Sequence, residues 1–293
     1  MFSDRLINSV RRWLGSLLIV TILCGCSFVR LGYDQSETLL RWWLNRQLDL
    51  TAEQSRWLKE ELSKFHTWHR HTQLPAYAAL AANLSRQSAE EISPAQACDN
   101  IDAAAAQIEA LLRQAAPVLA GLARQLEMGQ LQHLRRRFAE DDREWREKWL
   151  DAAPEKRLRQ RQEDWIDRAE SYYGRLTREQ REFIRQAVQR SSWDPQLSWD
   201  RRQQRQQQIL ATLDKIIRQR LPQQAAEEEL LALMERSLRP EDSRFTAMQQ
   251  LLQKEACVNL AGLHQLASPS QRYKARDKLA AYEQDFRQLS AKP

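Results

Sequence analysis

The sequence predicts an all-α protein, an elongated array of roughly nine to eleven helices with no sheet. Ala, Leu, Gln, Arg and Glu dominate the 293 residues, and all five are helix formers of good propensity. Glycine, which tight hairpins and phosphate-binding loops require, occurs only seven times, and strand-favouring valine is scarce. With 42% hydrophobic residues and ten tryptophans, the chain can bury a core and is not disordered.

The first 25 residues predict a lipoprotein signal peptide. Basic residues precede an apolar run over residues 13–22, which is shorter than the roughly 20 residues that span a bilayer. The run ends in Leu23-Cys24-Gly25-Cys26, which resembles the lipobox of bacterial lipoproteins. The resemblance implies cleavage before Cys26, diacylglycerol on its sulfur and a further acyl chain, such as palmitate, on its amino group. An ordinary signal peptide or an uncleaved anchor is the alternative.

The residue after the lipobox indicates the membrane. In Gram-negative sorting, an Asp at this position typically retains a lipoprotein in the inner membrane, so Ser27 implies the outer membrane, facing the periplasm. We expect a lipidated Cys26 and a short tether over residues 26–35, followed by a single all-helical periplasmic domain over residues 36–293. The covalent lipid is the only cofactor that we expect.

Two cysteines remain once Cys26 is lipidated. Cys98 and Cys257 would lie in an oxidising compartment, where disulfides persist. Their disulfide would close a loop of about 160 residues and contribute up to ~5 kcal/mol in the chain-entropy description. We expect this disulfide, with two separately buried thiols as the alternative.

Capping residues and prolines place the helices in order along the chain. Apolar residues recur at helical spacing after the starts, as in Leu40, Leu44 and Leu48. Pro75 should make a corner, and Pro117 should kink or break its helix. The predicted helix starts are Ser36, Thr51, Ser93, Leu131, Pro154, Thr177, Pro222 or Gln223, Pro240 and Ser268, with a further polar helix ending at Pro222.

A weak internal repeat is present. Leu50-Thr51-Ala52-Glu53-Gln54 matches Leu176-Thr177-Arg178-Glu179-Gln180, and Ser268-Pro269-Ser270-Gln271 echoes both. In each, the hydroxyl can accept a hydrogen bond from a free amide while the glutamine reaches back. The favoured interpretation is that these are helix starts and nothing more. The two Leu-Thr-x-x-Gln motifs also show a weaker resemblance to small periplasmic stress chaperones of the Spy/CpxP type.

A more specific resemblance follows from residues between Cys26 and Tyr77. The lipobox, Leu31-Gly32-Tyr33 and the string Trp68-His69-Arg70 followed by Leu74-Pro75 and Tyr77 resemble an uncharacterised family of proteobacterial envelope lipoproteins. Phe138, Trp145, residues 154–157 and Leu176-Thr177 with Gln180 continue the match over nearly the whole mature chain. The resemblance implies an all-helical envelope lipoprotein and brings no known activity. The candidate contact or structural hub consists of Trp68, His69, Arg70, Leu74, Pro75 and Tyr77.

Metal binding is a weaker interpretation of the histidines. His66 and His69 share a helix face, so both could reach one Zn²⁺. A structural site needs two more ligands, and Glu61 or His133 could serve only if the fold brings them near. We expect no metal, with the imidazoles packing or hydrogen-bonding near Pro75.

The basic stretches are expected to form a solvated face. Residues 135–137, 157–161 and 201–205 are rich in arginine, but export excludes nucleic acid as a partner. Interleaved acidic residues favour solvation, with peptidoglycan carboxylates, anionic headgroups or an acidic partner as alternatives. Most tryptophans are expected in the core, with Trp42 and Trp43 at the membrane interface as the alternative.

No catalytic signature is present: the sequence has no Gly-flanked serine elbow, Gly-rich phosphate loop or His-Glu-x-x-His motif. We therefore expect a non-enzymatic, outer-membrane-anchored lipoprotein with an interaction or structural role in the cell envelope. Its expected partners are the membrane, through the lipid, and an envelope protein or peptidoglycan. The alternatives are a tethered periplasmic chaperone or stress protein and an enzyme that acts on cell-wall or lipid material.

Overall fold

A computed structural model describes residues 27–292, so the expected signal peptide and the lipidated Cys26 lie outside the described residues. Within that range the chain is helical with no strand, which confirms the all-α prediction. Because α4, η1 and α5 follow one another without a break, eleven separate helical segments result. The bounds are α2 (Ser27–Asp34), α3 (Ser36–Leu48), α4 (Ala52–Trp68), the π-helix η1 (His69–Gln73), α5 (Leu74–Gln87), α6 (Pro94–Ala123), α7 (Met128–Trp149), α8 (Pro154–Tyr173), α9 (Arg178–Gln189), α10 (Pro195–Gln219), α11 (Gln223–Leu238), α12 (Ser243–Gln265) and α13 (Pro269–Ser290).

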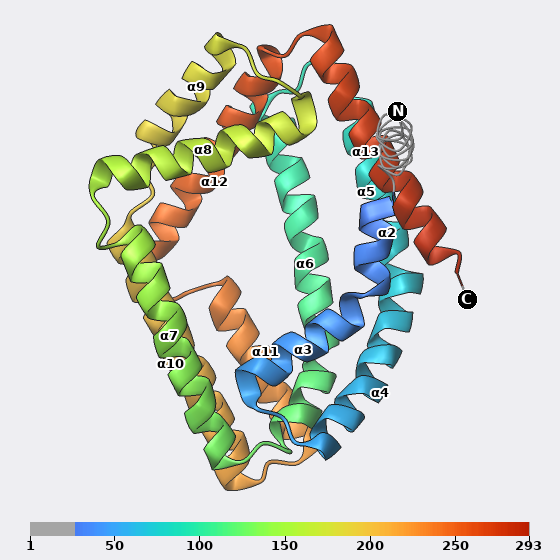
Figure 1. Cartoon of the computed structure of the whole chain (residues 1–293), viewed down its shortest axis with the longest axis vertical. Helices are drawn as coiled ribbons and strands as arrows, with labels where there is room; N and C mark the ends of the chain where they lie inside the picture. The colour runs from blue at the N-terminus through green and yellow to red at the C-terminus, as the bar shows by residue number, and fades with distance from the viewer. Residues whose placement is uncertain (1–26, 293) are drawn as a thin grey trace, which may run out of the picture.

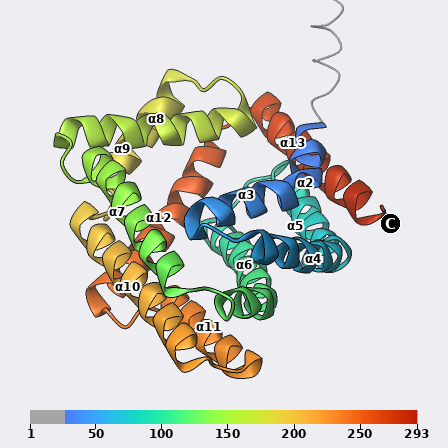
Figure 2. The ribbon, with the colours of Figure 1, turned by 60° about the horizontal axis from the view of Figure 1, so that its bottom comes forward.

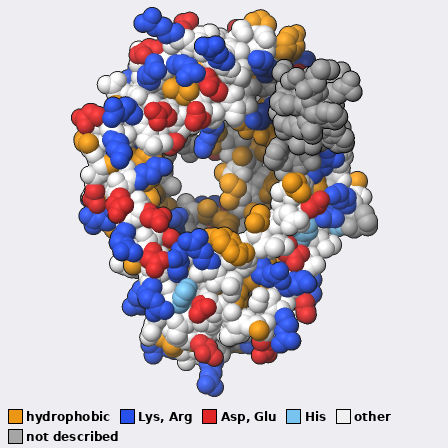
Figure 3. Space-filling view, viewed as in Figure 1, with side chains coloured by type: hydrophobic (Ala, Val, Ile, Leu, Met, Phe, Trp, Pro, Cys, Tyr) orange, Lys and Arg blue, Asp and Glu red, His pale blue; other side chains and the backbone are white. Residues whose placement is uncertain are grey.

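The helices close into a ring (Figure 1). One side is the pair α7 and α10, which also lie side by side in the turned view of Figure 2, and the other side contains α4, α5 and α13. The space-filling view shows an opening through the molecule with hydrophobic side chains on its wall (Figure 3). No helix of the described part is long and apolar enough to cross a membrane.

Two hydrophobic cores lie at opposite ends of the ring. The lower lobe surrounds the first core, where α3, α4, α6, α7, α10 and α11 meet around residues such as Leu58, Leu122 and Ile216. The upper lobe surrounds the second core, built from α8, α9, α12 and α13 around residues such as Ile184 and Leu263. The long helix α6 connects the two lobes, since it packs on α12 and on α11.

The two lobes are built around the same pair of glutamines. In the lower lobe, Gln54 and Gln130 exchange amide hydrogen bonds at 3.0 and 2.8 Å. In the upper lobe, Gln180 and Gln271 do the same at 2.8 and 3.0 Å. All four side chains also complete capping boxes at the starts of α4, α7, α9 and α13. The repeated motifs are therefore helix starts, as predicted, but they also join two helices in each lobe.

A close contact between glycine and an aromatic ring repeats as well. A Cβ atom on Gly121 would lie 2.6 Å from the Trp57 ring, and one on Gly262 would lie 2.7 Å from the Phe183 ring. Each ring comes three residues after its glutamine, and each glycine comes nine residues before the partner glutamine. The matched spacing shows that the upper lobe is a structural repeat of the lower one.

The disulfide prediction is confirmed, because Cys98 and Cys257 are bonded with a Cα–Cα distance of 5.1 Å. The bond joins α6 to α12 beside Ile92, Ala97 and Ile101, where the upper half of α6 lies against α12.

Three local predictions are wrong. Pro75 makes no corner, because α4 continues through η1 into α5. The wider π turn places the Leu74 N–H on the His69 carbonyl, and Pro75, which has no N–H, lies in the first turn of α5. Pro117 lies inside α6 without breaking it. Ser36 is the first residue of α3 and donates to the Tyr33 carbonyl instead of capping the helix. Residues 27–34, within the expected tether over residues 26–35, form the helix α2.

The tryptophans lie at the margins of the cores, as Trp57 does where it packs against the lower one, and not at their centres. None of the nine in the described range is fully buried. Trp42 and Trp43 have 59% and 50% of their surface exposed, and Trp165 has 41%. The cores are instead filled by leucine, isoleucine and alanine, whose smaller side chains allow the helices to approach closely.

Candidate functional site

The predicted hub lies where the described chain begins. Tyr33 of α2 packs its ring 4.5 Å from the His66 ring, and its hydroxyl is 3.1 Å from His69 Nδ1. Arg70 lies over the same tyrosine, 5.9 Å from the ring centre. Trp68 contacts Phe65 and the edge of His69. The hub therefore binds α2 to the junction of α4 and η1.

The remaining hub residues continue this packing towards α13. Tyr77 meets His69 edge-on at 5.5 Å and Phe286 of α13 at 5.8 Å, while Leu74 is almost fully buried. Pro75 is exposed to solvent and does not belong to this packing. The Arg30 side chain of α2 lies 3.2 Å from the buried carboxylate of Asp285 on α13. These contacts hold α2, α5 and α13 together, so the hub's role in the fold is structural.

The hub histidines are held neutral. Burial lowers the pKa of His69 to about 4, and burial together with the Arg70 charge lowers the pKa of His66. Among residues 27–292 no three or more His, Cys, Asp or Glu side chains gather in a way that could hold a metal ion. Glu61 pairs with Lys64, and the His133 ring contacts the Arg46 carbonyl, so neither joins His66.

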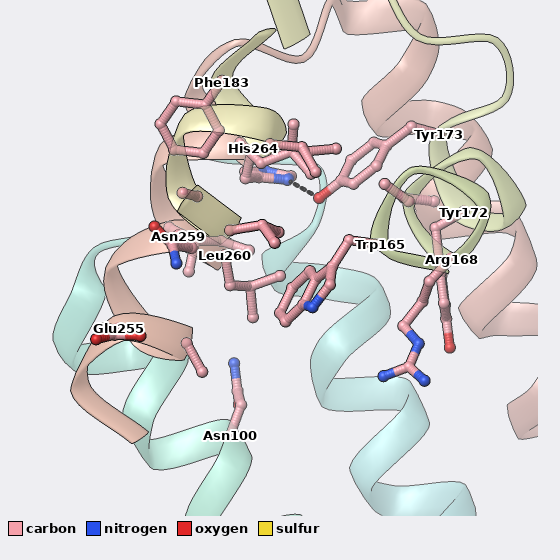
Figure 4. A pocket seen from close by; sticks show the side chains of 18 of the residues that line it. Asn100, Trp165, Arg168, Tyr172, Tyr173, Phe183, Glu255, Asn259, Leu260 and His264 are labelled. Atoms are coloured by element: carbon pink, nitrogen blue, oxygen red, sulfur yellow. Dashed lines mark hydrogen bonds between the residues drawn. The ribbon is translucent and has the colours of Figure 1, made fainter. Parts of the chain in front are cut away.

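A deeper site lies in the upper lobe, where an apolar cavity of about 420 Å³ separates α8 and α9 from α12 and α13 (Figure 4). Trp165 and Leu260 line it while keeping 41% and 38% of their surface exposed, so the cavity is open to solvent at these residues. Ser88, Asn100, Ser191 and Asn259 are among the polar residues that line it. Arg161 and Arg168 of α8 lie at its edge with Glu255 of α12.

The polar groups deep in the cavity satisfy one another. The Nε2 atom of His264 is 2.7 Å from the Glu90 carbonyl oxygen. Because a carbonyl oxygen can only accept, Nε2 carries the proton. The unprotonated Nδ1 then accepts a hydrogen bond from the Tyr173 hydroxyl at 2.9 Å. Burial lowers the pKa of His264 and raises the pKa of Tyr173 to about 12. Both groups are therefore neutral. The two hydrogen bonds, called the Tyr173–His264 relay below, hold α8 and α12 to the segment before α6.

The lower lobe has a smaller cavity at the same positions of the repeat. Its volume is about 310 Å³. Its walls include Gln47, Leu122, Ala123, Leu134 and Phe138, at the repeat positions of Tyr173, Leu263, His264, Ala275 and Leu279 in the upper cavity. In the lower lobe α10 and α11 cover this space, and their buried leucines belong to the core. The upper cavity is therefore the larger of the two copies.

Sequence reasoning did not find this cavity. Its walls come from six helices, and alanine, leucine and tyrosine at helical spacing give the same pattern in a filled core. A usable signal was present in the repeat: aligning Gln130 with Gln271 places Ala275 opposite Leu134, which is a loss of side-chain volume at a buried position.

The fold defines an all-α protein of two similar lobes around an opening. By sequence, the chain belongs to the family described as a family of unknown function (DUF6279), which matches residues 46–244. The match confirms that the chain belongs to an uncharacterised domain family. No curated protein and no solved structure matches the chain.

Proposed function

We propose that this chain is a lipoprotein, anchored through Cys26 in the outer membrane and facing the periplasm, which acts by binding and not by catalysis. The binding site is the upper cavity, and its ligand carries an apolar group. The observation that supports this is an open apolar cavity of about 420 Å³, within the usual range for small-ligand sites. The lower copy supports it too, because the same space there is smaller and is lined by core leucines of two further helices, α10 and α11.

The exposed surface near the start of the described chain supports membrane attachment. Leu31, Leu39, Trp42 and Trp43 each expose half or more of their surface, and all follow the expected lipid within a short stretch. Apolar and aromatic side chains of this kind favour the interface between lipid and water. Replacing Cys26 with Ser should move the protein out of the outer-membrane fraction and abolish labelling by palmitate. The matched change Cys24→Ser should leave both unchanged, and continued labelling of the Cys26→Ser protein would contradict the proposal.

The chemistry of the cavity supports binding. Tyr173 and His264 are hydrogen-bonded to each other, and the Glu255 carboxylate accepts the Ser192 N–H at 2.8 Å. Nucleophilic catalysis needs a nucleophile in contact with a base that can take its proton. Here the histidine's other nitrogen is committed to a backbone carbonyl, and the tyrosine is held in its neutral form.

A neutral fluorescent probe tests the binding site directly. N-phenyl-1-naphthylamine should bind the purified protein saturably with one site per chain. Leu260→Asp, which places a charge in the cavity wall, should weaken binding about tenfold or more because an apolar ligand would cover the carboxylate and remove its water without offering it a partner. Leu251→Asp is the matched control, since Leu251 lies on the same helix and is exposed at 49% without lining the cavity. Equal binding by both variants would contradict the assignment.

A tethered chaperone is the second candidate. The glutamine pairs formed by the Leu-Thr-x-x-Gln motifs and the opening with hydrophobic side chains on its wall favour it. A chaperone should slow the aggregation of several unrelated unfolded proteins at equal or lower molar ratio. Suppression of none of them would exclude this candidate while leaving the probe-binding site unaffected.

A further inference from the structure

A second cavity adjoins the first and has the opposite character. It has a volume of about 440 Å³ and lies where α7, α8, α10 and α12 approach one another. Four arginines and four aromatic rings surround it, and no carboxylate is among the described residues that line it. The lining consists of Trp145, Trp149, Trp193, Phe245, Arg161, Arg201, Arg202, Arg205 and Ser198.

The arginines are held in place by their stacking on the rings. Arg161 lies 4.6 Å above the Trp193 ring, and Arg201 lies 5.7 Å from the Phe245 ring centre. A guanidinium that stacks through its face keeps the N–H groups of its edge available for a carboxylate or phosphate. The aromatic walls therefore orient the guanidinium groups of Arg161 and Arg201.

Arg201 is the most informative of these residues. Arg201 is only 7% exposed. Its guanidinium donates hydrogen bonds to the carbonyls of Arg236 and Ser237 and to the Gln204 side chain. Within residues 27–292 it forms no salt bridge, and the neighbouring Arg205 forms none either. Arg202, by contrast, is paired with Asp142 at 2.5 Å. The hydrogen-bond partners of Arg201 are neutral, and the Asp242 carboxylate acts on it only through space. Burying such a guanidinium is costly, and a bound anion would offset part of that cost.

The two cavities meet at shared residues. Arg161 and Trp193 line both of them. The Arg161 guanidinium donates to the Ser191 hydroxyl at 3.0 Å, which fixes it at the boundary between the apolar space and the arginine cluster. A ligand that occupied both spaces would therefore have an apolar part and an anionic part joined at this point.

We propose that the two cavities form one site for an anionic amphiphile, with its hydrocarbon chain in the upper-lobe cavity and its phosphate or carboxylate head group on Arg161, Arg201 and Arg205. This inference rests on the proposed function, because it names the ligand of the same cavity. The charge of the head group is matched by arginines, and the flat tryptophan walls offer surface for the part of the ligand next to the charge.

The test compares ligands of equal chain length and different charge. The full chain carrying Cys26→Ala is used, so that no covalent lipid competes for the cavity. Binding of monomeric dodecyl phosphate, dodecanoate, dodecanol and dodecyltrimethylammonium is measured by calorimetry. We expect the two anions to bind at least about tenfold more tightly than dodecanol, as charge-assisted hydrogen bonds predict, and the cation to bind most weakly. The tighter of the two anions then identifies the head group.

Paired variants locate the two parts of the ligand. Arg205→Gln changes an exposed arginine, so it should leave the fold intact, weaken dodecyl phosphate about tenfold and leave dodecanol unchanged. Arg218→Gln is the matched control on the same helix, because Arg218 pairs with Asp214 and lines neither cavity. Leu260→Asp should weaken all four ligands.

The possible failures are distinguishable. If no dodecyl compound binds, the proposed function fails together with this inference. If dodecanol binds as tightly as dodecyl phosphate and Arg205→Gln changes neither, the apolar site stands and the anionic head group is wrong. If inorganic phosphate binds as tightly as dodecyl phosphate, the arginines form an anion site without a chain, which also overturns the inference.

Discussion

The lower and upper lobes share a plan and differ in what fills it. Both join two helix starts through a glutamine pair, and both press a glycine against an aromatic ring. The lower lobe then adds α10 and α11, and its core holds Leu126 and Leu134. The upper lobe has Ala267 and Ala275 at those positions and keeps an open cavity of about 420 Å³.

The difference indicates a division of roles between the copies. Smaller side chains leave dispersion contacts unmade, so an open cavity reduces stability unless a ligand occupies it. The upper lobe carries two stabilising devices for which the lower lobe has no counterpart, namely the disulfide at Cys257 and the Tyr173–His264 relay. The corresponding lower positions are Ala116, Gln47 and Ala123. We interpret the lower lobe as the structural copy and the upper lobe as the binding copy.

Removing the disulfide should give the largest effect. The double variant Cys98→Ala/Cys257→Ala gives the upper lobe the alanine of the lower one at position 257. Because the bond joins residues 159 positions apart, the chain-entropy description predicts a loss of about 5 kcal/mol in the free energy of unfolding. Urea denaturation measures this loss, and chemical reduction of the wild-type protein should reproduce it. Equal stability of the oxidised and reduced protein would contradict the prediction.

The glutamine pairs should matter equally in the two lobes. Gln54→Ala and Gln180→Ala each remove a cap and leave the partner amide buried without its hydrogen bonds, which should cost about 2–3 kcal/mol. Within one lobe, Gln180→Ala and Gln271→Ala should cost less together than the sum of the single changes, because the second change removes the stranded partner. Strict additivity in denaturation experiments would show that the two amides are not coupled.

The two glycine contacts should respond alike, with a smaller effect. Gly121→Ala and Gly262→Ala should each destabilise by about 1–3 kcal/mol, since the added methyl group would meet an aromatic ring. Gly129→Ala is the control, because an added methyl group there would have no neighbour within 4 Å, and it should stabilise α7 by about 0.5–1 kcal/mol. Thermal unfolding measures all three variants. A destabilised Gly121→Ala beside an unaffected Gly262→Ala would argue against equivalent lobes.

The smallest effect is a dependence on pH. The pKa values of His69 and His264 are lowered in the fold, so the unfolded chain takes up their protons first as the pH falls. Stability is then complete above pH ~6.5 and declines as the pH drops from there, towards about 4 for His69. For His69 the loss between pH 7 and 6 should be at most about 0.7 kcal/mol, because solvent screening reduces it, and His264 should add a loss of the same sign. The exposed His71, changed to Gln, should leave this slope unaltered, whereas His69→Gln should reduce it.

Local features of the fold could be predicted from the sequence because local chemistry fixes them. Thr51, Ser93, Thr177 and Ser268 cap helices as expected, since a hydroxyl and a glutamine three residues later suffice for a capping box. The disulfide followed from the number of cysteines left in an oxidising compartment.

Features that depend on distant contacts could not be predicted in the same way. Gln180 and Gln271 are 91 positions apart, and nothing in either motif shows which other helix start it will meet. Trp42 and Trp43 have the spacing of core residues, yet the helix presents them to solvent. The sequence predicts a solvated face for the arginines at 161, 201 and 205, and it cannot show that α8 and α10 converge around one cavity, since that convergence depends on the closure of the ring.

The most direct measurement of the central claim exchanges one residue between the lobes. Ala275→Leu places in the larger, upper cavity the leucine that occupies the same repeat position, Leu134, in the smaller, lower one. Binding of N-phenyl-1-naphthylamine to this variant is compared with binding to the wild-type protein, with unfolding measured on both. If the upper lobe is the binding copy, the variant stays folded and loses at least about tenfold in affinity, because the chain of the leucine takes up the ligand's space. Unchanged binding by a folded Ala275→Leu protein would contradict the account.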